Sequence, residues 1–290
     1  MQLTSTRKSA IRRPRRRRRR AGGQDGPYRT DNLRWHIDPK NVNCWPGSGS
    51  TLYDLTSNNL DFAKKGSPTY DASDGSFAYD GTNDGWVAPN NSNCLHKFRS
   101  GNSAEEEWTI EFWIKYGVDD GNQRTFLSKL FPTDFNTANT NNSQISWRIK
   151  GDGTQSLWNR IVKQKGTTNY ENVFIQDVND WSVTDGEWTH VVMLYDYQNS
   201  TNTVKSYLNG DTSTVFNLLS NGGFDNKDGL NCQLGPEGPW GIGCAWRNAD
   251  NSLYGNTFLG NIGIIRYYAD VISTSDIEGN YAAEKWRYGH

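Results

Sequence analysis

The sequence predicts an all-β protein, an antiparallel β-sandwich with one short C-terminal helix. Short segments of alternating apolar and polar residues recur through residues 27–290, with glycine or asparagine between them. The apolar content is only 34%, but 12 Trp, 14 Tyr and 11 Phe bury much area each. Many short strands and one late helix are typical of a sandwich, and sandwiches of roughly 200 to 250 residues form single domains. We therefore expect residues 27–290 to be one domain.

The clearest strand is expected at residues 108–116, where apolar and more polar side chains alternate. One face, expected to lie in the core, carries Trp108, Ile110, Phe112, Ile114 and Tyr116; the other carries Thr109, Glu111, Trp113 and Lys115. Residues 190–195 read as a more fully buried strand, and a strand at 203–208 follows a polar turn. Asn209 and Gly210 then close a tight turn, because both tolerate positive φ. These segments predict a β-meander around residues 188–215.

The remaining elements follow from similar signals. Further strands are expected at residues 34–37, 76–79, 85–88, 124–130, 144–149, 173–176 and 256–268. The helix is expected to begin at Ser273 or Thr274, which can cap its first amides, with Asp276 and Glu278 near its positive end. Ile277, Tyr281, Ala282 and Lys285 follow helical spacing.

The first twenty residues form a strongly basic segment. They contain no acidic residue and ten basic ones: Arg7, Lys8, Arg12, Arg13, Arg15, Arg16, Arg17, Arg18, Arg19 and Arg20. The chain has 31 Lys plus Arg against 32 Asp plus Glu, so the remainder has 21 basic and 32 acidic residues, a net charge of about −11. Like charges without apolar residues repel one another and gain little by folding. We expect residues 1–26 to be a disordered arm that binds nucleic acid.

Basic N-termini also occur in secretory, localisation and membrane-binding signals. Residues 21–26 contain no apolar stretch, so we expect no secretory signal. A nuclear localisation signal remains an alternative, because roughly five to eight clustered Lys or Arg satisfy it. Gln2 does not fit N-myristoylation, and no amphipathic helix, C-terminal cysteine motif or membrane-length apolar stretch accompanies the basic run. We therefore expect no membrane partner.

The four cysteines do not predict a metal centre. Cys44, Cys94, Cys232 and Cys244 lack the short spacings of zinc sites, and the four histidines are scattered. We expect free, partly buried thiols. If a disulfide forms, Cys232 and Cys244 are the expected pair, since they flank a Gly/Pro-rich loop.

Several segments resemble the laminin G-like domains of the concanavalin A-like lectin/glucanase superfamily. They are residues 108–115 (WTIEFWIK), 185–192 (DGEWTHVV), 204–210 (VKSYLNG), 261–268 (NIGIIRYY) and 272–277 (ISTSDI). Residues 46–55 (PGSGSTLYDL) and 77–84 (FAYDGTND) resemble opening blocks common in viral and phage members. The resemblance spans roughly residues 33–285. It implies a concanavalin A-like jelly roll.

That superfamily contains lectins, glycosidases, adhesion modules and viral structural domains, so the fold does not decide the function. Its glucanase branch carries carboxylates at alternating strand positions, which places them on one sheet face. Here Glu105, Glu106 and Glu107 are consecutive and Glu111 stands alone. We therefore expect no enzymatic activity and assign no catalytic residue.

Two further site hypotheses concern loops. Asp80, Asn83 and Asp84 lie in one turn whose oxygen atoms suit Ca²⁺, as the resemblance also implies, although the same residue types are ordinary turn formers. We expect no other cofactor. Trp240 lies in a Gly/Pro-rich loop, and Trp246 and Tyr254 follow it. Exposed aromatic rings stack on glycans or protein partners. For two of these three residues, packing in the core or within a loop is the expected role.

The arm and the sandwich together favour a virion structural protein, either a coat or a capsid-associated subunit. Many small-virus coat proteins join a basic arm, which binds the packaged genome, to a β-sandwich. Phosphate neutralisation releases counterions whatever the base sequence. The sandwich would contact other copies of itself or other virion proteins, and its acidic surface would disfavour binding the genome with the wrong face. The alternative is a glycan-binding virion fibre, decoration or host-recognition module, and a cellular nuclear lectin-like protein is a third class.

Overall fold

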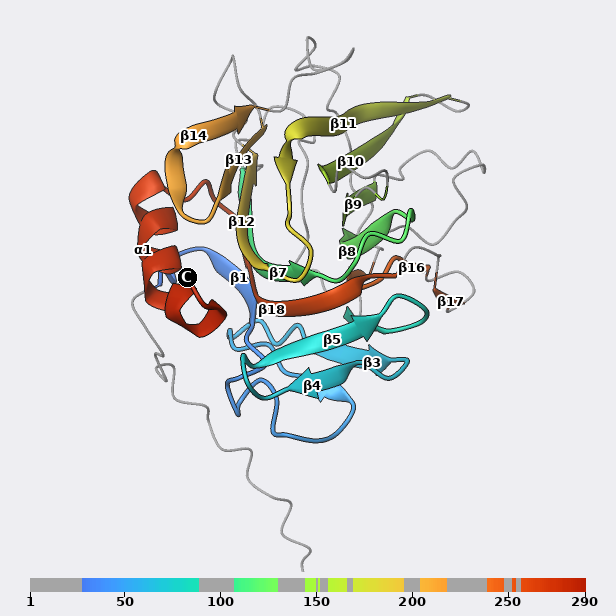
Figure 1. The fold of residues 1–290 in the computed structure, drawn as a ribbon, viewed down its shortest axis with the longest axis vertical. Helices are drawn as coiled ribbons and strands as arrows, with labels where there is room; N and C mark the ends of the chain where they lie inside the picture. Colours follow the sequence, from blue (N-terminus) through green and yellow to red (C-terminus); the bar gives the residue numbers. More distant parts are fainter. Residues whose placement is uncertain are drawn as a thin grey trace, which may run out of the picture.

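The computed structural model describes residues 28–88, 107–129, 144–149, 151, 156–165, 169–195, 204–217, 239–247, 252–253 and 257–290. Within these ranges the chain forms two antiparallel sheets, packed as a sandwich, and one α-helix that lies beside them (Figure 1). The expected fold class, an all-β sandwich with one short C-terminal helix, is confirmed. No helix in the described ranges is long and apolar enough to cross a membrane.

Each sheet contains eight strands, and a small two-stranded ladder lies apart from them. The first sheet runs in the order β14 (Asp211–Asn217), β13 (Val204–Leu208), β12 (Trp188–Tyr195), β7 (Trp108–Tyr116), β18 (Leu259–Tyr268), β5 (Ser76–Asp80) and β4 (Thr69–Asp71), with β1 (Leu33–Ile37) also paired to β18. The second runs β11 (Asn169–Ser182), β10 (Ser156–Lys165), β9 (Gln144–Ile149), β8 (Arg124–Lys129), β15 (Trp240–Ile242), β6 (Gly85–Ala88), β3 (Phe62–Lys65) and β2 (Thr51–Leu52). The ladder joins β16 (Trp246–Arg247) and β17 (Ser252–Leu253).

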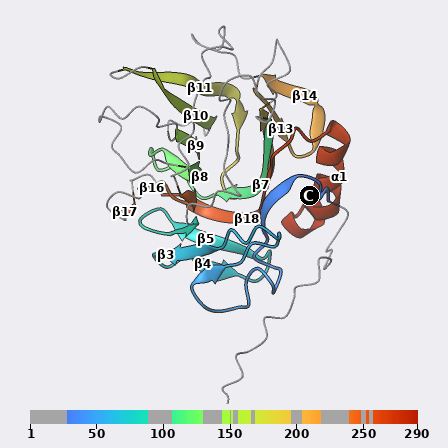
Figure 2. The same ribbon diagram turned by 180° about the vertical axis from the view of Figure 1, so that it is seen from behind.

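Strand β18 lies inside the first sheet and pairs with neighbouring strands on both of its edges. One edge of β18 pairs with β7 along most of its length. On its other edge, residues 259–262 pair with β5 and residues 265–268 pair with β1. The first described strand, β1, and the last strand, β18, therefore pair within the first sheet. Figure 2 shows β18 between β7 and β5 from behind.

Aromatic side chains fill the space between the sheets. Trp35 of β1, Trp147 of β9 and Trp240 of β15 are each at most 1% exposed. The rings of Trp147 and Trp240 stack with an interplanar angle of 7°, and the ring of Trp35 meets that of Trp240 edge-on at a centroid distance of 5.4 Å. Because each such ring buries a large apolar area, a chain with a modest apolar content still builds a continuous core.

Helix α1 (Thr274–Glu284) and the 3₁₀ turn η3 (Lys285–Tyr288) cover the outer face of the first sheet. Ser273 caps α1, because its hydroxyl accepts the Asp276 amide while the Asp276 carboxylate accepts the Ser273 amide. The ring of Tyr288 stacks on Trp113 of β7 at 4.3 Å. Both faces of β7 are therefore buried, whereas its sequence pattern indicated only one core face.

Most of the expected elements are confirmed. Strands 85–88, 108–116 and 144–149 have the expected bounds, and Asn209 and Gly210 adopt φ values of 49° and 69° in the expected turn. The strands that were not predicted are β2, β3, β4, β10, β15, β16 and β17, and β11 is much longer than the predicted 173–176. All of the missed strands except β10 have only two to four residues, too few for an alternating pattern to show.

The described cysteines are free thiols. Cys44 and Cys244 are both fully buried, and burial raises the pKa of Cys244 to about 12. These two thiols are accordingly unreactive at neutral pH. Cys94 and Cys232 lie outside the described residues.

Candidate functional site

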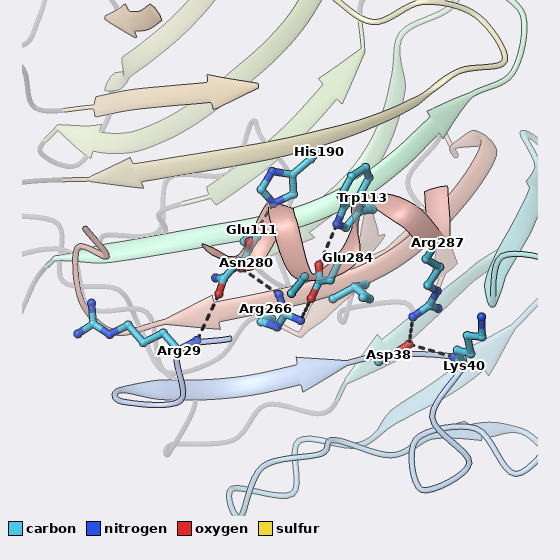
Figure 3. A network of polar contacts seen from close by, with 12 residues as sticks. Arg29, Asp38, Lys40, Glu111, Trp113, His190, Arg266, Asn280, Glu284 and Arg287 are labelled. Carbon is cyan, nitrogen blue, oxygen red and sulfur yellow. Dashed lines mark hydrogen bonds and ion pairs between the residues drawn. The ribbon is translucent and has the colours of Figure 1, made fainter. Parts of the chain in front are cut away.

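The most conspicuous group of polar side chains lies between the first sheet and α1. Glu111 of β7 is 0% exposed and receives contacts from three elements. Its Oε1 lies 2.8 Å from Nε2 of His190 on β12, and its Oε2 lies 3.1 Å from the guanidinium of Arg266 on β18. The side-chain amide of Asn280, on α1, donates to the same Oε2 at 2.9 Å. Figure 3 shows these side chains pointing toward one another beneath the helix.

A second carboxylate enters the same network from the helix. Glu284 accepts a hydrogen bond from the indole N–H of Trp113 at 2.9 Å and forms an ion pair with Arg266. Arg266, only 1% exposed, thus bridges Glu111 and Glu284. We call these five side chains, Glu111, His190, Arg266, Asn280 and Glu284, the polar network.

The charges of the polar network compensate one another. Burial disfavours the charged form of Glu111, but Arg266 and His190 outweigh burial and lower the pKa of this carboxyl. Burial likewise acts against the charged form of Arg266, and Glu284 and Glu111 raise the pKa of the guanidinium well above its ordinary value. Glu111 and Arg266 are therefore held in their charged forms.

This geometry suits a structural role, in which the polar network holds α1 to the sheet. Glu111 and Glu284 are 0% and 6% exposed, so neither presents an oxygen atom to a substrate in solution. Their oxygen atoms already accept hydrogen bonds from the protein. The polar network therefore fastens α1 across β7, β12 and β18, because leaving any one partner unpaired in this environment is costly.

The first described residues of the chain are fixed to the same region. The aromatic ring of Tyr28 lies 4.2 Å from the guanidinium carbon of Arg266. Arg29 forms ion pairs with Asp270 and Asp276, and its backbone amide donates to the side chain of Asn280 at 3.2 Å. The chain leaving the basic segment is thus fixed beside α1.

The ten basic residues predicted to bind nucleic acid lie outside the described residues, as does the predicted domain boundary at residue 26. Both stay predictions. What the structure adds is the position at which the chain enters the body, at Tyr28 and Arg29.

Of the predicted calcium ligands, Asp80 is the last residue of β5, and Asn83 and Asp84 lie in the connection from β5 to β6. Both carboxylate oxygens of Asp84, a buried residue, accept backbone amides, Oδ1 from Ser67 at 2.6 Å and Oδ2 from Asp80 at 3.2 Å. Oδ1 of Asp80 accepts the Thr82 amide at 2.8 Å. Turn hydrogen bonding thus occupies these oxygens, and the described residues contain no group of three or more His, Cys, Asp or Glu arranged to hold a metal. Calcium binding at this turn stays a prediction.

The three aromatic residues predicted to contact a glycan or a partner differ in their placement. Trp240 is 1% exposed, so its prediction as an exposed contact is wrong. It lies in β15, which is inserted between β8 and β6, and its ring packs in the core. Trp246 lies on β16, but its side chain is not among those that the structure describes. Tyr254 lies outside the described residues.

The polar network itself was not predicted from the sequence, although a signal was present. Arg266 interrupts the otherwise apolar end of β18 (IIRYY), and Glu111 lies between Ile110 and Phe112 on β7. A charge within a strand that is buried on both faces indicates a buried partner.

Comparisons with known proteins agree with this architecture. The family model Laminin_G_3, described as the concanavalin A-like lectin/glucanases superfamily, matches residues 80–278. No curated protein matches the sequence. Among solved structures, the receptor-binding domain of botulinum neurotoxin C/D mosaic serotype is similar with a TM-score of 0.52 and 15% identity, covering 88% of this chain and 52% of that one.

A sialidase from Trypanosoma rangeli, in complex with 2,3-difluorosialic acid, is similar with a TM-score of 0.51 and 10% identity, covering 91% of this chain and 35% of the sialidase. This chain thus spans about half the length of the neurotoxin domain and about a third of the sialidase. At these identities the likeness concerns the fold.

Proposed function

Because this chain belongs to the concanavalin A-like lectin/glucanase superfamily, we propose that its sandwich is a binding and assembly domain whose basic N-terminal segment binds nucleic acid, within a virion structural protein. The sandwich would contact other copies of itself or other virion proteins. On this proposal the protein is not an enzyme.

One observation carries the proposal, the separation of charge along the chain. Residues 1–20 carry ten basic and no acidic side chains, while the rest of the chain has 21 basic and 32 acidic ones. A basic segment of this density attracts phosphate backbones irrespective of sequence, and an acidic body repels them. The opposite charges direct a polyanion toward one end of the molecule.

The attachment of the basic segment supports the same reading. Arg29 is held by Asp270 and Asp276, so the segment would emerge from a fixed point on the body. A subunit that packages a genome needs such a point, because the segment must reach the nucleic acid while the sandwich keeps its place among its neighbours.

Purification of the complete chain and of a chain lacking residues 1–26 tests the proposal. We expect the complete chain to retain nuclease-sensitive nucleic acid and the truncated chain to be free of it. Electron microscopy of the complete chain with added nucleic acid is expected to show regular assemblies. A complete chain that purifies without nucleic acid and stays dispersed when nucleic acid is added would contradict the virion proposal.

A second candidate is a glycan-binding or host-recognition module. The observation in its favour is the superfamily itself, together with the fold shared with a neurotoxin receptor-binding domain. A glycan array probed with the chain lacking residues 1–26 separates the two candidates. Saturable binding to one glycan class, without retained nucleic acid in the complete chain, would favour recognition over packaging.

A further inference from the structure

We infer that Trp286, with Lys40 and Lys285, forms a contact site for single-stranded nucleic acid on the body of the protein, an inference that rests on the proposed function of the basic segment. Trp286 is 69% exposed, whereas every other tryptophan whose side chain is described is at most 9% exposed. Tryptophan is highly buried on average, so the exposed indole of Trp286 is a large aromatic face that is open to a ligand.

The indole of Trp286 is held in place before any ligand arrives. Its N–H donates to the carbonyl of Ala283 at 2.7 Å, which fixes the ring against the end of α1. Fixing the ring in advance lowers the entropy lost on binding. Nucleobases stack on such rings whatever their identity, since every base has a π-face.

The charge around Trp286 suits a phosphate backbone. The ammonium of Lys40 lies 5.3 Å from the centre of the Trp286 ring, and exposed Lys285 precedes it in the chain. The nearby carboxylate of Asp38 is already paired with Arg287 at 2.7 Å (Figure 3). One lysine therefore lies over the exposed ring, and the ammonium of the second lies 5.6 Å from the ring of Tyr281, on the preceding turn of the same helical segment. An aromatic ring with positive charge beside it is typical of single-strand binding.

The site lies close to the point where the basic segment joins the body. The backbone of Arg29 bonds to Asn280, six positions before Trp286 on the same helical segment, a rise of about 10 Å. The 27 residues before Tyr28 reach at most about 90 Å when extended, so a strand held by the basic segment comes within reach of Trp286. Binding by the segment would raise the effective concentration of bases at this ring.

The test compares two fluorescent probes of equal length, oligothymidylate and an abasic oligonucleotide that keeps the sugar-phosphate chain. Affinities are measured by anisotropy with the complete chain. We expect Trp286→Ala to weaken binding of oligothymidylate by roughly five-fold or more and to leave the abasic probe unchanged, because only stacking is lost. Trp286→Phe should restore most of the affinity for oligothymidylate.

Replacing both Lys40 and Lys285 with serine should weaken the binding of both probes. The slope of log K against log salt concentration should become shallower by roughly 1.4, the value that two phosphate contacts imply on single strands. The matched control is Val118→Ala, at another exposed apolar position, which should change neither affinity. Unchanged thermal unfolding of Trp286→Ala excludes a folding defect.

Equal binding of oligothymidylate by the wild-type chain and Trp286→Ala would overturn this inference and leave the basic segment as the nucleic-acid element. Failure of the wild-type chain to bind either probe would overturn the proposed function and this inference together. Loss of glycan binding in Trp286→Ala, with oligothymidylate affinity intact, would assign the ring to a sugar instead.

Discussion

Arg266→Met removes the cation that joins the two buried carboxylates of the polar network. Methionine keeps much of the volume of the arginine stem, so the change mainly leaves Glu111 and Glu284 without their common partner. Breaking a buried ion pair from one side costs about 3 to 5 kcal/mol. For a domain of this size that corresponds to a fall in the unfolding midpoint of roughly 6 to 20 °C.

The pH dependence of this loss identifies its cause. Without Arg266, burial outweighs the remaining contacts of Glu111, and the pKa of this carboxyl rises. A carboxyl whose folded pKa is raised binds its proton more readily in the folded state, so the variant gains stability as the pH falls through that value. The deficit relative to the wild-type chain is therefore expected to be smaller at about pH 5 than at about pH 7.5.

Urea unfolding of both chains, followed by tryptophan fluorescence at the two pH values, measures the effect. Arg34→Met, at an exposed position of β1, is the matched control and is expected to lower the stability by much less than Arg266→Met. If Arg266→Met unfolds at the same urea concentration as the control, the polar network does not hold α1 to the sheet. An equal deficit at both pH values would show that the remaining carboxylates are not the source of the instability.

Three further outcomes follow from the same contacts. Ser273→Ala removes the cap of α1 and should lower the free energy of unfolding by about 1 kcal/mol in urea titrations; no change would show that the cap is dispensable. Burial, with Arg266 and Arg287, lowers the pKa of His36 well below its ordinary value, so the unfolded chain takes up the extra proton. Stability should therefore fall below about pH 6.5, by at most ~1.4 kcal/mol per pH unit, and His36→Phe should lose this slope. Since Glu111 is 0% exposed, β-glucans should release no reducing sugar, and a release that Glu111→Gln abolishes would refute the structural role of this residue.

The sequence indicated strand β7 and the start of α1 because their signals are local. The alternation in β7 is visible in nine consecutive residues, and the cap of α1 lies within four. The polar network depends instead on residues 111, 190, 266, 280 and 284, which only the folded chain brings together. No partner for Glu111 was recognised in the sequence, because the helix that covers it is more than 160 residues away in the chain.

Trp240 was misread for a related reason. Its glycine- and proline-rich surroundings are typical of a loop, and a three-residue strand shows no alternation. Pairing with β8 and β6 places it in the middle of the second sheet, where neighbours from distant parts of the chain bury it. The exposure of Trp286 was not predicted, because the sequence pattern does not show which side chains at the end of a helix are exposed.

The central claim is that the basic segment binds nucleic acid through its charge. The most direct measurement is the salt dependence of the affinity of the complete chain for DNA. If all ten basic side chains meet phosphates, the slope of log K against log salt concentration approaches roughly −9 on duplex DNA and −7 on single strands; six engaged charges still give roughly −4 to −5. Replacement of Arg15 to Arg20 by serine should reduce the slope by more than half. An affinity that is independent of salt, or that survives these six substitutions, would contradict the claim.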